Sequence, residues 1–392
     1  MKLAFVIPWY GEISGGAENE CKNTAENLLS KGIEVEVLTT CVKDFYGNWG
    51  QDYYDEGEYE LNGVKVRRFA VRKRDSKAFD EVNYKLMHNQ RISSEEEQVY
   101  IRETINSNRL YDYIKSNGGS YDFFIFIPYM FGTTYYSSQI HPKKSILIPC
   151  LHDENYAYLN IYKPVFEKIR GMILHSDSER ELAEHIFDLS SVKSKVIGEG
   201  VDTHLNYKAS RFLRKYKVNK PFILYVGRND IGKNVHTLIE FFSEYKKKNK
   251  NTLKLVLIGP GEIQIPKEHK QDILKLGFIP TQDKYDAYAA ALLLCQPSIN
   301  ESFSLVIMES WIYGRPVLVN EKCAPTKEFC IKSNGGLWFS DYDEFESCVN
   351  LMLKNPSLAK KFGLNGRKYV LKNFKWNKIT EDLIQYLESL KE

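Results

Sequence analysis

Two glutamates, Glu301 and Glu309, bracket an apolar run in the segment NESFSLVIMESWIYGRPVL. A carboxylate is rarely buried without a polar partner, so we expect a polar ligand to meet both. Eight residues is slightly more than two helical turns, and a helix that begins near Leu305 would place Glu309 on the side that Glu301 faces. The free N–H groups of Ser304, Leu305 and Val306 would then lie between the two carboxylates.

Two cations follow an apolar strand in the segment YVGRNDIGKN, where the strand ends at Gly227. Arg228 can bind a diphosphate in a bidentate way and Lys233 adds a compact charge, while a helix that begins near Asn234 would contribute its N-terminal dipole. The segment is not a P-loop, because Asn234 stands where that motif requires Ser or Thr. The alternative is an exposed loop with two unrelated surface cations.

Together these two segments suit a sugar nucleotide. Carboxylates accept hydrogen bonds from the hydroxyl groups of two sugar rings, and amides with cations hold the diphosphate between them. A carboxylate directly against a diphosphate would be repelled, so the separation of the two glutamates is physically reasonable. The alternative is that Glu301 caps the helix and Glu309 lies on the surface.

A pair of glycines follows the first strand in GEISGGAEN. Gly15 and Gly16 allow the backbone to approach phosphate or sugar oxygens closely at a helix N-terminus. The segment does not match G-x-G-x-x-G, so it does not favour a nicotinamide dinucleotide. A tight turn without a ligand is the alternative.

The segment PCLHDENYAY places His152 directly after another strand, with Asp153 and Glu154 beside it. A side chain at the end of a strand in an open α/β sheet faces the ligand crevice. His152 is therefore a candidate for contact with a substrate, and Asp153 or Glu154 is a candidate for proton abstraction. A structural histidine is the alternative.

The elements that would position these residues alternate between apolar strands and amphipathic helices, which is the pattern of helices packed on mostly parallel sheets. One series begins at residue 2 and a second near Pro221, and each opens with a strand, a glycine-bearing loop and a helix. The sequence thus predicts two Rossmann-like, doubly wound domains that face a central cleft, joined within VIGEGVDTHLNYKAS. Residues 375–392 form a further amphipathic helix.

Net charge, cysteine spacing and hydropathy argue against several classes of protein. The 392 residues carry a net charge of +3, which does not favour a nucleic-acid binder. Seven scattered cysteines without a CxxC pair indicate neither zinc nor a disulfide framework, and they fit a reducing cytosol. The N-terminus lacks the pattern of a signal peptide, and no stretch is apolar enough to span a membrane.

One basic stretch, VKVRRFAVRKRDSK, could still meet anionic lipid headgroups or a phosphorylated substrate. A solvated strand and loop is the alternative. The cations concerned are Arg67, Arg68, Arg72, Lys73, Arg74 and Lys77.

The chain resembles retaining glycosyltransferases of GT-B fold, of the family 4 type. The resemblance lies in GGAE after the first strand, GR with a lysine five positions after the arginine, GEGVD at the junction, and above all PSINESFSLVIMESWIYGRPVL. It covers nearly the whole chain and is strongest from about 196 to 320. The E-x7-E pattern alone is moderately specific, and in order with the GR and lysine pattern it is strong.

The resemblance implies that the C-terminal domain binds a nucleotide diphosphate sugar and that the acceptor approaches from the N-terminal domain. Glu301 would contact the donor sugar and Glu309 the ribose. It implies no metal and no cofactor, because cations and a helix terminus would stabilise the leaving diphosphate. Further implied donor contacts are Arg228 and Lys233 to the diphosphate, the amides of Leu305 and Val306 to phosphate, and the backbone of Phe278 or Ile279 to the base, for which a buried strand end is the alternative. The predicted donor-binding set also includes Gly15, Gly16, Ser302, Phe303 and Ser304.

One departure from the family lies in the segment Ser302-Phe303-Ser304, because relatives usually carry glycine at the position of Ser304, and often at that of Ser302, in the pattern E-x-F-G. Glycine lets phosphate approach without a Cβ atom, whereas Ser304 narrows the space and could donate a hydroxyl. We interpret this as a change in donor choice or orientation that could also weaken activity.

The sequence therefore predicts an acceptor-binding domain at 1–197, a nucleotide-sugar domain at 198–374 and a returning helix at 375–392. The predicted function is retaining transfer of a sugar to a glycan or lipid-linked acceptor in surface polysaccharide synthesis. His152, Glu301 and Asp153 are the predicted catalytic residues. We expect a cytoplasmic protein, with peripheral contact at the inner face of the membrane as a further hypothesis. A sugar-nucleotide 2-epimerase, a glycogen-type synthase and a catalytically silent sugar-nucleotide-binding subunit are the alternatives.

Overall fold

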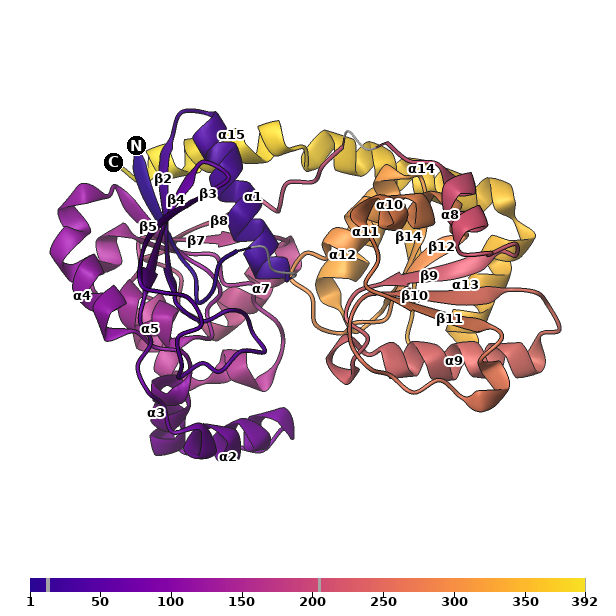
Figure 1. Cartoon of the computed structure of the whole chain (residues 1–392). Helices are drawn as coiled ribbons and strands as arrows, with labels where there is room; N and C mark the ends of the chain where they lie inside the picture. Colours follow the sequence, from indigo (N-terminus) through magenta and orange to yellow (C-terminus); the bar gives the residue numbers. More distant parts are fainter. Residues whose placement is uncertain (12–14, 204–205, 392) are drawn as a thin grey trace. The chain divides into compact units, whose positions relative to one another are not determined.

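The computed structural model of the chain describes residues 1–11, 15–203 and 206–391. Two compact units make up the chain (Figure 1). Unit 1 contains Met1–Gly200 together with Trp376–Glu392, and unit 2 contains Val201–Lys375. The first boundary thus falls three residues after the predicted end at 197. His204 and Leu205 of the predicted junction lie outside the described residues.

Unit 1 is built on an eight-stranded sheet with the order β3-β4-β2-β1-β5-β6-β7-β8. Only the edge pair β3 and β4 is antiparallel among the described strands, and the other neighbours are parallel. Its strands are β1 (Lys2–Val6), β2 (Glu34–Thr40), β3 (Gly57–Leu61), β4 (Val64–Phe69), β5 (Phe123–Phe126), β6 (Ser145–Leu147), β7 (Gly171–Leu174) and β8 (Lys193–Val196). Its helices are α1 (Gly16–Ser30), α2 (Ser76–Met87), α3 (Ser94–Glu103), α4 (Asn108–Asn117), α5 (Gly132–Ser138), α6 (Lys163–Phe166), α7 (Asp177–Ile186) and α15 (Trp376–Ser389).

The central strands are continuous apolar runs because helices cover both faces of the sheet. In β1, Leu3, Ala4 and Phe5 are fully buried, and Leu3 lies opposite Val35 of β2 and Phe123 of β5. The strand order reverses between β1 and β5, so the loops that follow these two strands flank the place where ligands bind in such sheets.

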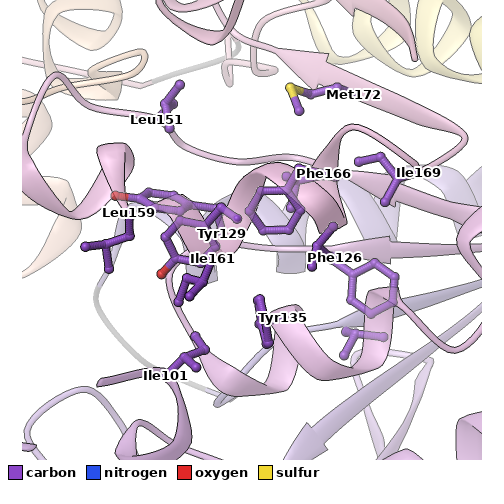
Figure 2. Close-up of a cluster of buried hydrophobic side chains, with 14 of the residues drawn as sticks. Ile101, Phe126, Tyr129, Tyr135, Leu151, Leu159, Ile161, Phe166, Ile169 and Met172 are labelled. Carbon is purple, nitrogen blue, oxygen red and sulfur yellow. The ribbon is translucent and has the colours of Figure 1, made fainter. Parts of the chain in front are cut away.

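Aromatic and branched side chains fill the core of unit 1 beside β5 (Figure 2). Phe126 and Phe166 are fully buried, and Tyr162 stacks on Phe166 with ring centroids 5.3 Å apart. Leu151 is 1% exposed in the same cluster. The burial of Leu151 fixes the loop after β6, and the candidate residue His152 directly follows Leu151 in this loop.

The C-terminal helix α15 packs on unit 1. The Tyr386 hydroxyl donates a 2.6 Å hydrogen bond to the carbonyl of Lys193 in β8, and Arg170 Nε donates to the carbonyl of Leu390 at 2.9 Å. A Cβ atom on Gly200 would lie 2.2 Å from the indole ring of Trp376, so the chain needs glycine where α15 begins.

Unit 2 has a six-stranded parallel sheet with the order β11-β10-β9-β12-β13-β14. Its strands are β9 (Phe222–Val226), β10 (Lys254–Ile258), β11 (Ile273–Gly277), β12 (Leu293–Gln296), β13 (Val317–Asn320) and β14 (Gly336–Phe339). Its helices are α8 (Ala209–Lys215), α9 (Val235–Lys248), α10 (Thr281–Ala290), α11 (Leu305–Ile312), α12 (Ala324–Ser333), α13 (Tyr342–Lys354) and α14 (Pro356–Asn373). Figure 1 shows α9 on one face of this sheet and α10, α11 and α14 on the other. Here the strand order reverses between β9 and β12.

The predicted fold class is confirmed by two doubly wound α/β units. Among the described helices, none is long and apolar enough to cross a lipid bilayer.

Candidate functional site

The predicted diphosphate and glutamate segments both lie at the reversal point of the unit 2 sheet. Arg228 and Lys233 follow β9, and Glu301 follows β12, its neighbour in the sheet. The Asn234 side-chain amide donates to the carbonyl of Pro297 at 3.0 Å and ties the two loops together. The fold therefore brings together two segments that are almost seventy residues apart in sequence.

Glu301 forms an ion pair with Lys233. Lys233 Nζ lies 2.7 Å from Glu301 Oε1, and the two side chains are 25% and 12% exposed. Gln296, at the end of β12, donates to the same carboxylate oxygen at 3.3 Å. Burial and the charge of Glu301 raise the pKa of Tyr225, whose hydroxyl donates to the carbonyl of Arg228. Glu301 is thus a fixed, partly buried carboxylate that already shares a cation.

Arg228 points toward a neighbouring acid. Its Nε lies 3.4 Å from Asp230 Oδ2, and the other oxygen of Asp230 accepts the backbone N–H of Lys233 at 2.9 Å. Asp230 therefore shapes the loop that carries both cations.

Two glycines, Gly259 and Gly261, determine how the loop after β10 packs. A Cβ atom on Gly259 would lie 1.9 Å from the carbonyl of Gly227, and one on Gly261 would lie 2.8 Å from the carbonyl of Asn229. Both glycines have left-handed φ angles, of +132° and +107°. The loop after β10 needs them because it packs directly on the backbone of the loop after β9.

The helix α11 begins at Leu305, as expected, and Ser304 stands at its N-cap. Ser304 has φ +72° and ψ +77°, a left-handed conformation that favours glycine, and it is 8% exposed. Gln296 Nε2 donates to Ser304 Oγ at 3.4 Å. The amides of Leu305 and Val306 lie in the first turn, where N–H groups have no acceptor within the helix. Phe303 is 3% exposed and packs on Phe374, so its ring serves the core of unit 2.

A glycine variant tests this conformation. We expect Ser304→Gly to be as stable as the wild type to within about 0.5 kcal/mol, because relief of the left-handed strain offsets the larger unfolded-state entropy of glycine. Ser304→Ala keeps the strain and loses the contact with Gln296, so its free energy of unfolding should fall by about 1 kcal/mol. Urea denaturation measures both variants, and a glycine variant less stable than the alanine variant would contradict the assignment.

Glu309 is held from the neighbouring helix α10. Lys284 Nζ lies 2.7 Å from Glu309 Oε1, and the Tyr288 hydroxyl donates to Oε2 at 2.6 Å. Burial lowers the pKa of Lys284, but the charge of Glu309 outweighs it and the net pKa is raised. Burial and Glu309 both raise the pKa of Tyr288. Lys284 therefore stays charged and Tyr288 stays protonated.

The predicted base contact lies at the end of β11. Ile279 is 7% exposed, whereas the side chain of Phe278 is 74% exposed. The buried Ile279 fixes the path of the backbone, and the adjacent ring of Phe278 faces solvent.

In unit 1, Gly15 forms the N-cap of α1 and Gly16 its first residue. A Cβ atom on Gly15 would lie 1.8 Å from Glu18 Oε2, and the Trp9 indole N–H donates to Glu18 Oε1. The carboxylate of Glu18 thus occupies the space beside Gly15. Residues 12–14 of the predicted loop lie outside the described residues.

His152 is partly exposed, with 27% of its side chain accessible, and its Nδ1 lies 3.4 Å from Glu154 Oε1. Asp153 accepts a 2.7 Å hydrogen bond from the hydroxyl of Tyr158. The three residues lie together in the loop after β6, as their sequence order requires.

Sequence reasoning missed a buried charged cluster next to this loop. His175 Nε2 lies 2.6 Å from Glu20 Oε1, and His175 Nδ1 lies 3.2 Å from Glu179 Oε2. Burial lowers the pKa of His175, but Glu20 and Glu179 outweigh it and hold the pKa well above its usual value. Glu179 Oε1 also accepts the backbone N–H of Leu151 at 2.6 Å, so the cluster anchors the loop that carries His152. The sequence signal for this cluster was a histidine at the end of a strand, followed by a glutamate four residues later.

Three potential metal ligands occur in this cluster. Ligand atoms of Glu20, Cys150 and His175 all lie within 4.8 Å of one another. The 2.6 Å contact between His175 and Glu20 has the length of a hydrogen bond, whereas two ligands of a tetrahedral zinc ion lie roughly 3.3 Å apart. Burial and Glu20 raise the pKa of the Cys150 thiol, so it stays protonated. These groups fit a hydrogen-bonded cluster better than a metal centre.

The predicted basic surface does not form as one patch. Arg67 pairs with Glu36 at 3.0 Å and with Glu58 at 2.6 Å. Arg68 is 4% exposed and donates to the carbonyl of Tyr10 at 2.6 Å. The expectation that Arg68 reaches an external anion is therefore wrong, because its charge is used inside unit 1.

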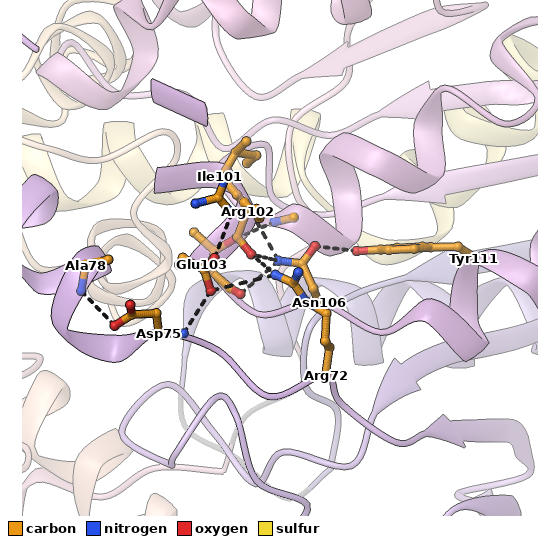
Figure 3. Close-up of polar contacts among 10 residues, drawn as sticks. Arg72, Asp75, Ala78, Ile101, Arg102, Glu103, Asn106 and Tyr111 are labelled. Atoms are coloured by element: carbon orange, nitrogen blue, oxygen red, sulfur yellow. Dashed lines mark hydrogen bonds and ion pairs between the residues drawn. The ribbon is translucent and has the colours of Figure 1, made fainter. Parts of the chain in front are cut away.

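The segment after β4 is tied to the end of α3 (Figure 3). Arg72 donates to the carbonyl of Arg102 and lies 3.8 Å from Glu103, and the backbone of Asp75 donates to Glu103 at 2.9 Å. Arg74 lies over aromatic rings of unit 1. Within the predicted set, Lys73 and Lys77 are the members that are exposed.

Comparisons with known proteins agree with this architecture. Residues 208–369 match the family model described as glycosyl transferases group 1. An uncharacterized glycosyltransferase of Methanocaldococcus jannaschii is 26% identical and covers 98% of this chain and 97% of its own length.

Solved structures show the same fold. Sucrose-phosphate synthase of Thermosynechococcus elongatus superposes with a TM-score of 0.72 at 17% identity, over 99% of this chain and 98% of that one. HepE of Anabaena, solved in complex with UDP-glucose, gives a TM-score of 0.71 at 15% identity, over 99% and 100%. The fold is that of GT-B glycosyltransferases, and the family match supports a glycosyltransferase.

Proposed function

We propose that this chain is a retaining, metal-independent glycosyltransferase that takes its sugar from a nucleotide diphosphate sugar bound to unit 2. The observation that carries the proposal is the Lys233–Glu301 pair at the reversal point of the unit 2 sheet, beside the first turn of α11. A cation, a carboxylate and free amides at one point are what a sugar joined to a diphosphate requires. The UDP-glucose complex of HepE supports the same class of donor.

In this proposal Lys233 and Arg228 bind the diphosphate. Lys233 already neutralises Glu301, so the carboxylate can lie near the diphosphate without strong repulsion. The amides of Leu305 and Val306 add donors at the positive end of the helix dipole. As the bond to the sugar breaks, negative charge grows on the leaving diphosphate, and these groups stabilise it in place of a metal ion.

The two glutamates bind the two sugar rings. Glu301 accepts hydrogen bonds from hydroxyls of the transferred sugar. The hydrogen bond from Gln296 limits the rotation of the Glu301 carboxylate. Glu309 accepts from the ribose, with Lys284 and Tyr288 holding its two oxygens. Ile279 offers its backbone to the base. Ser302 and Ser304 border the phosphate path and influence which donor fits.

Unit 1 supplies the acceptor side, while Gly15 and Gly16, at the N-terminus of α1, are proposed donor contacts. His152 orients the acceptor or the transferred sugar. Asp153 or Glu154 is a second candidate, after the leaving diphosphate, for removing the acceptor proton. Retention follows from attack on the face that the diphosphate leaves, with the diphosphate itself helping to remove the proton. We infer from the resemblance that the acceptor is a glycan or lipid-linked glycan of a surface polysaccharide.

A peripheral contact with the inner face of the membrane stays a proposal, and Lys73 and Lys77 are its exposed candidates. The second candidate function is a catalytically silent subunit that binds a sugar nucleotide. The left-handed Ser304 favours it, because its Cβ atom stands beside the proposed phosphate path.

A thermal-shift panel of UDP, GDP, ADP and dTDP sugars tests the proposal. A donor present at a hundred times its Kd should stabilise the folded chain by about 2.7 kcal/mol and raise Tm accordingly. Stabilisation by one nucleotide class, with release of the nucleotide diphosphate, supports an enzyme. Stabilisation without release on any acceptor supports the silent subunit, and no stabilisation by any donor contradicts both.

A further inference from the structure

We propose that the loop between β2 and β3 binds a sugar ring of the acceptor glycan through a surface that we term the aromatic platform. This inference rests on the proposed function and adds an acceptor subsite to it. The aromatic platform consists of Phe45, Tyr46, Trp49 and Tyr53.

The platform presents aromatic rings to solvent. Phe45 is 44% exposed, Tyr46 73% and Tyr53 63%. Leaving several large rings exposed within nine residues of one loop is unfavourable in water, and such patches mark binding sites. A sugar ring suits them, because its C–H groups form an apolar face that packs on the electron-rich face of an aromatic ring.

The rings are held in place before any ligand binds. The ring of Phe45 packs edge-on against Tyr46 at 5.4 Å and lies 5.6 Å from Trp49. The Trp49 indole N–H donates to the carbonyl of Phe45 at 2.9 Å, and Asp44 accepts the backbone N–H of Tyr46 at 2.9 Å. A ligand would therefore bind without ordering the loop, which favours affinity.

The platform is continuous with the strand ends of unit 1. Trp9, in the loop after β1, lies 5.9 Å from both Phe45 and Trp49, and Phe131, after β5, lies 5.1 Å from Trp9. Trp9 in turn donates to Glu18 at the N-terminus of α1. The exposed rings thus extend from the point where the order of the unit 1 sheet reverses.

The charge of the loop favours a glycan over a membrane. Residues 41–56 contain four carboxylates and a single lysine. The lysine, Lys43, lies over the ring of Tyr53, and Arg74 lies over Trp49 with its charge 5.1 Å from the ring. Arg109 pairs with Glu56, so the surroundings of the loop are close to neutral and attract anionic headgroups little, whereas carboxylate oxygens accept hydrogen bonds from sugar hydroxyls. The occupant that fits is a neutral saccharide.

The double variant Phe45→Ala/Tyr46→Ala tests this subsite, with Tyr84→Ala as the control. Tyr84 is an aromatic side chain of α2 that is 58% exposed and does not belong to the platform. Each protein is labelled and applied to an array of neutral oligosaccharides. We expect the wild type and the control to bind the same glycans and the double variant to bind them about tenfold or more weakly. A thermal shift with nucleotide sugars, run in parallel, checks folding and donor binding in unit 2.

A change in intrinsic tryptophan fluorescence when a trisaccharide is added gives a second readout in the wild-type protein. Equal glycan binding by the double variant would overturn the subsite, as would a wild type that binds a donor but no glycan. Weaker binding of the double variant to phosphatidylglycerol vesicles, without a change on the array, would assign the platform to a membrane and overturn the proposal. A wild type that binds glycans but no nucleotide sugar would keep the platform and contradict the proposed function.

Discussion

Replacing Lys233 with alanine is expected to reduce the rate of donor turnover by about a hundred- to a thousandfold, the usual cost of removing one group that stabilises a developing charge. The variant loses a cation at the diphosphate. It also leaves Glu301, whose side chain is 12% exposed, as an unpaired carboxylate beside the phosphate path. Both effects raise the energy of the departing diphosphate. The measurement is release of nucleotide diphosphate at saturating donor.

Lys378→Ala is the matched control, since Lys378 forms a 2.6 Å pair with Asp382 on α15, outside the donor site. Its turnover should equal that of the wild type. Lys233→Arg separates charge from shape, because it keeps the cation but changes its geometry. A folded Lys233→Ala variant that turns over donor at the wild-type rate would remove Lys233 from the mechanism.

Replacing Glu179 with alanine is expected to have the largest effect on stability, a loss of about 3–5 kcal/mol in the free energy of unfolding. Its side chain is fully buried and pairs with His175. It also accepts the backbone N–H groups of Leu151 and His175, both at 2.6 Å, and these would lose their acceptor in the interior. Urea denaturation measures the loss. Glu181→Ala, exposed on the same helix, should change stability by less than about 0.5 kcal/mol.

The pH dependence of stability identifies the ion pair itself. The pKa of His175 is raised above its usual 6.5 in the folded chain, so its stabilising contribution is complete below pH 6.5. Above that pH the unfolded chain loses a proton that the folded chain keeps, and the free energy of unfolding falls by up to about 1.4 kcal/mol per pH unit until the raised pKa is passed. The Glu179 variant should lose stability over a narrower pH range. If the wild type and the Glu179 variant showed identical pH profiles of stability, Glu179 would not be the group that keeps His175 charged.

Much of the unit 2 site could be predicted from local sequence. The helix start at Leu305 follows from the apolar run after Ser304. The position of Arg228, Lys233 and Glu301 in loops that follow strands can be predicted from the alternation of strands and loops. Their side-chain pairing could not be predicted in the same way. Whether Lys233 reaches Glu301 depends on which strands are neighbours in the sheet, and a single sequence does not state that order.

The features that could not be predicted have the same cause, because each depends on which distant elements pack together. Glu20 and His175 are 155 residues apart, and only the packing of α1 beside the end of β7 brings them together. Lys284 reaches Glu309 because α10 lies against α11. Position 259 requires glycine because its loop packs against the backbone of Gly227, which lies elsewhere in the sequence. Arg68 looked like a surface cation because its acceptor, the carbonyl of Tyr10, belongs to a distant loop.

Retaining, metal-independent transfer is tested most directly by proton NMR of the sugar that the wild-type chain releases from each donor of the panel. Water is the acceptor, and EDTA is present. We expect that one nucleotide class is hydrolysed without metal and that the first sugar to appear has the anomeric configuration of the donor. Failure to turn over any donor, or first appearance of the inverted anomer, would contradict this expectation.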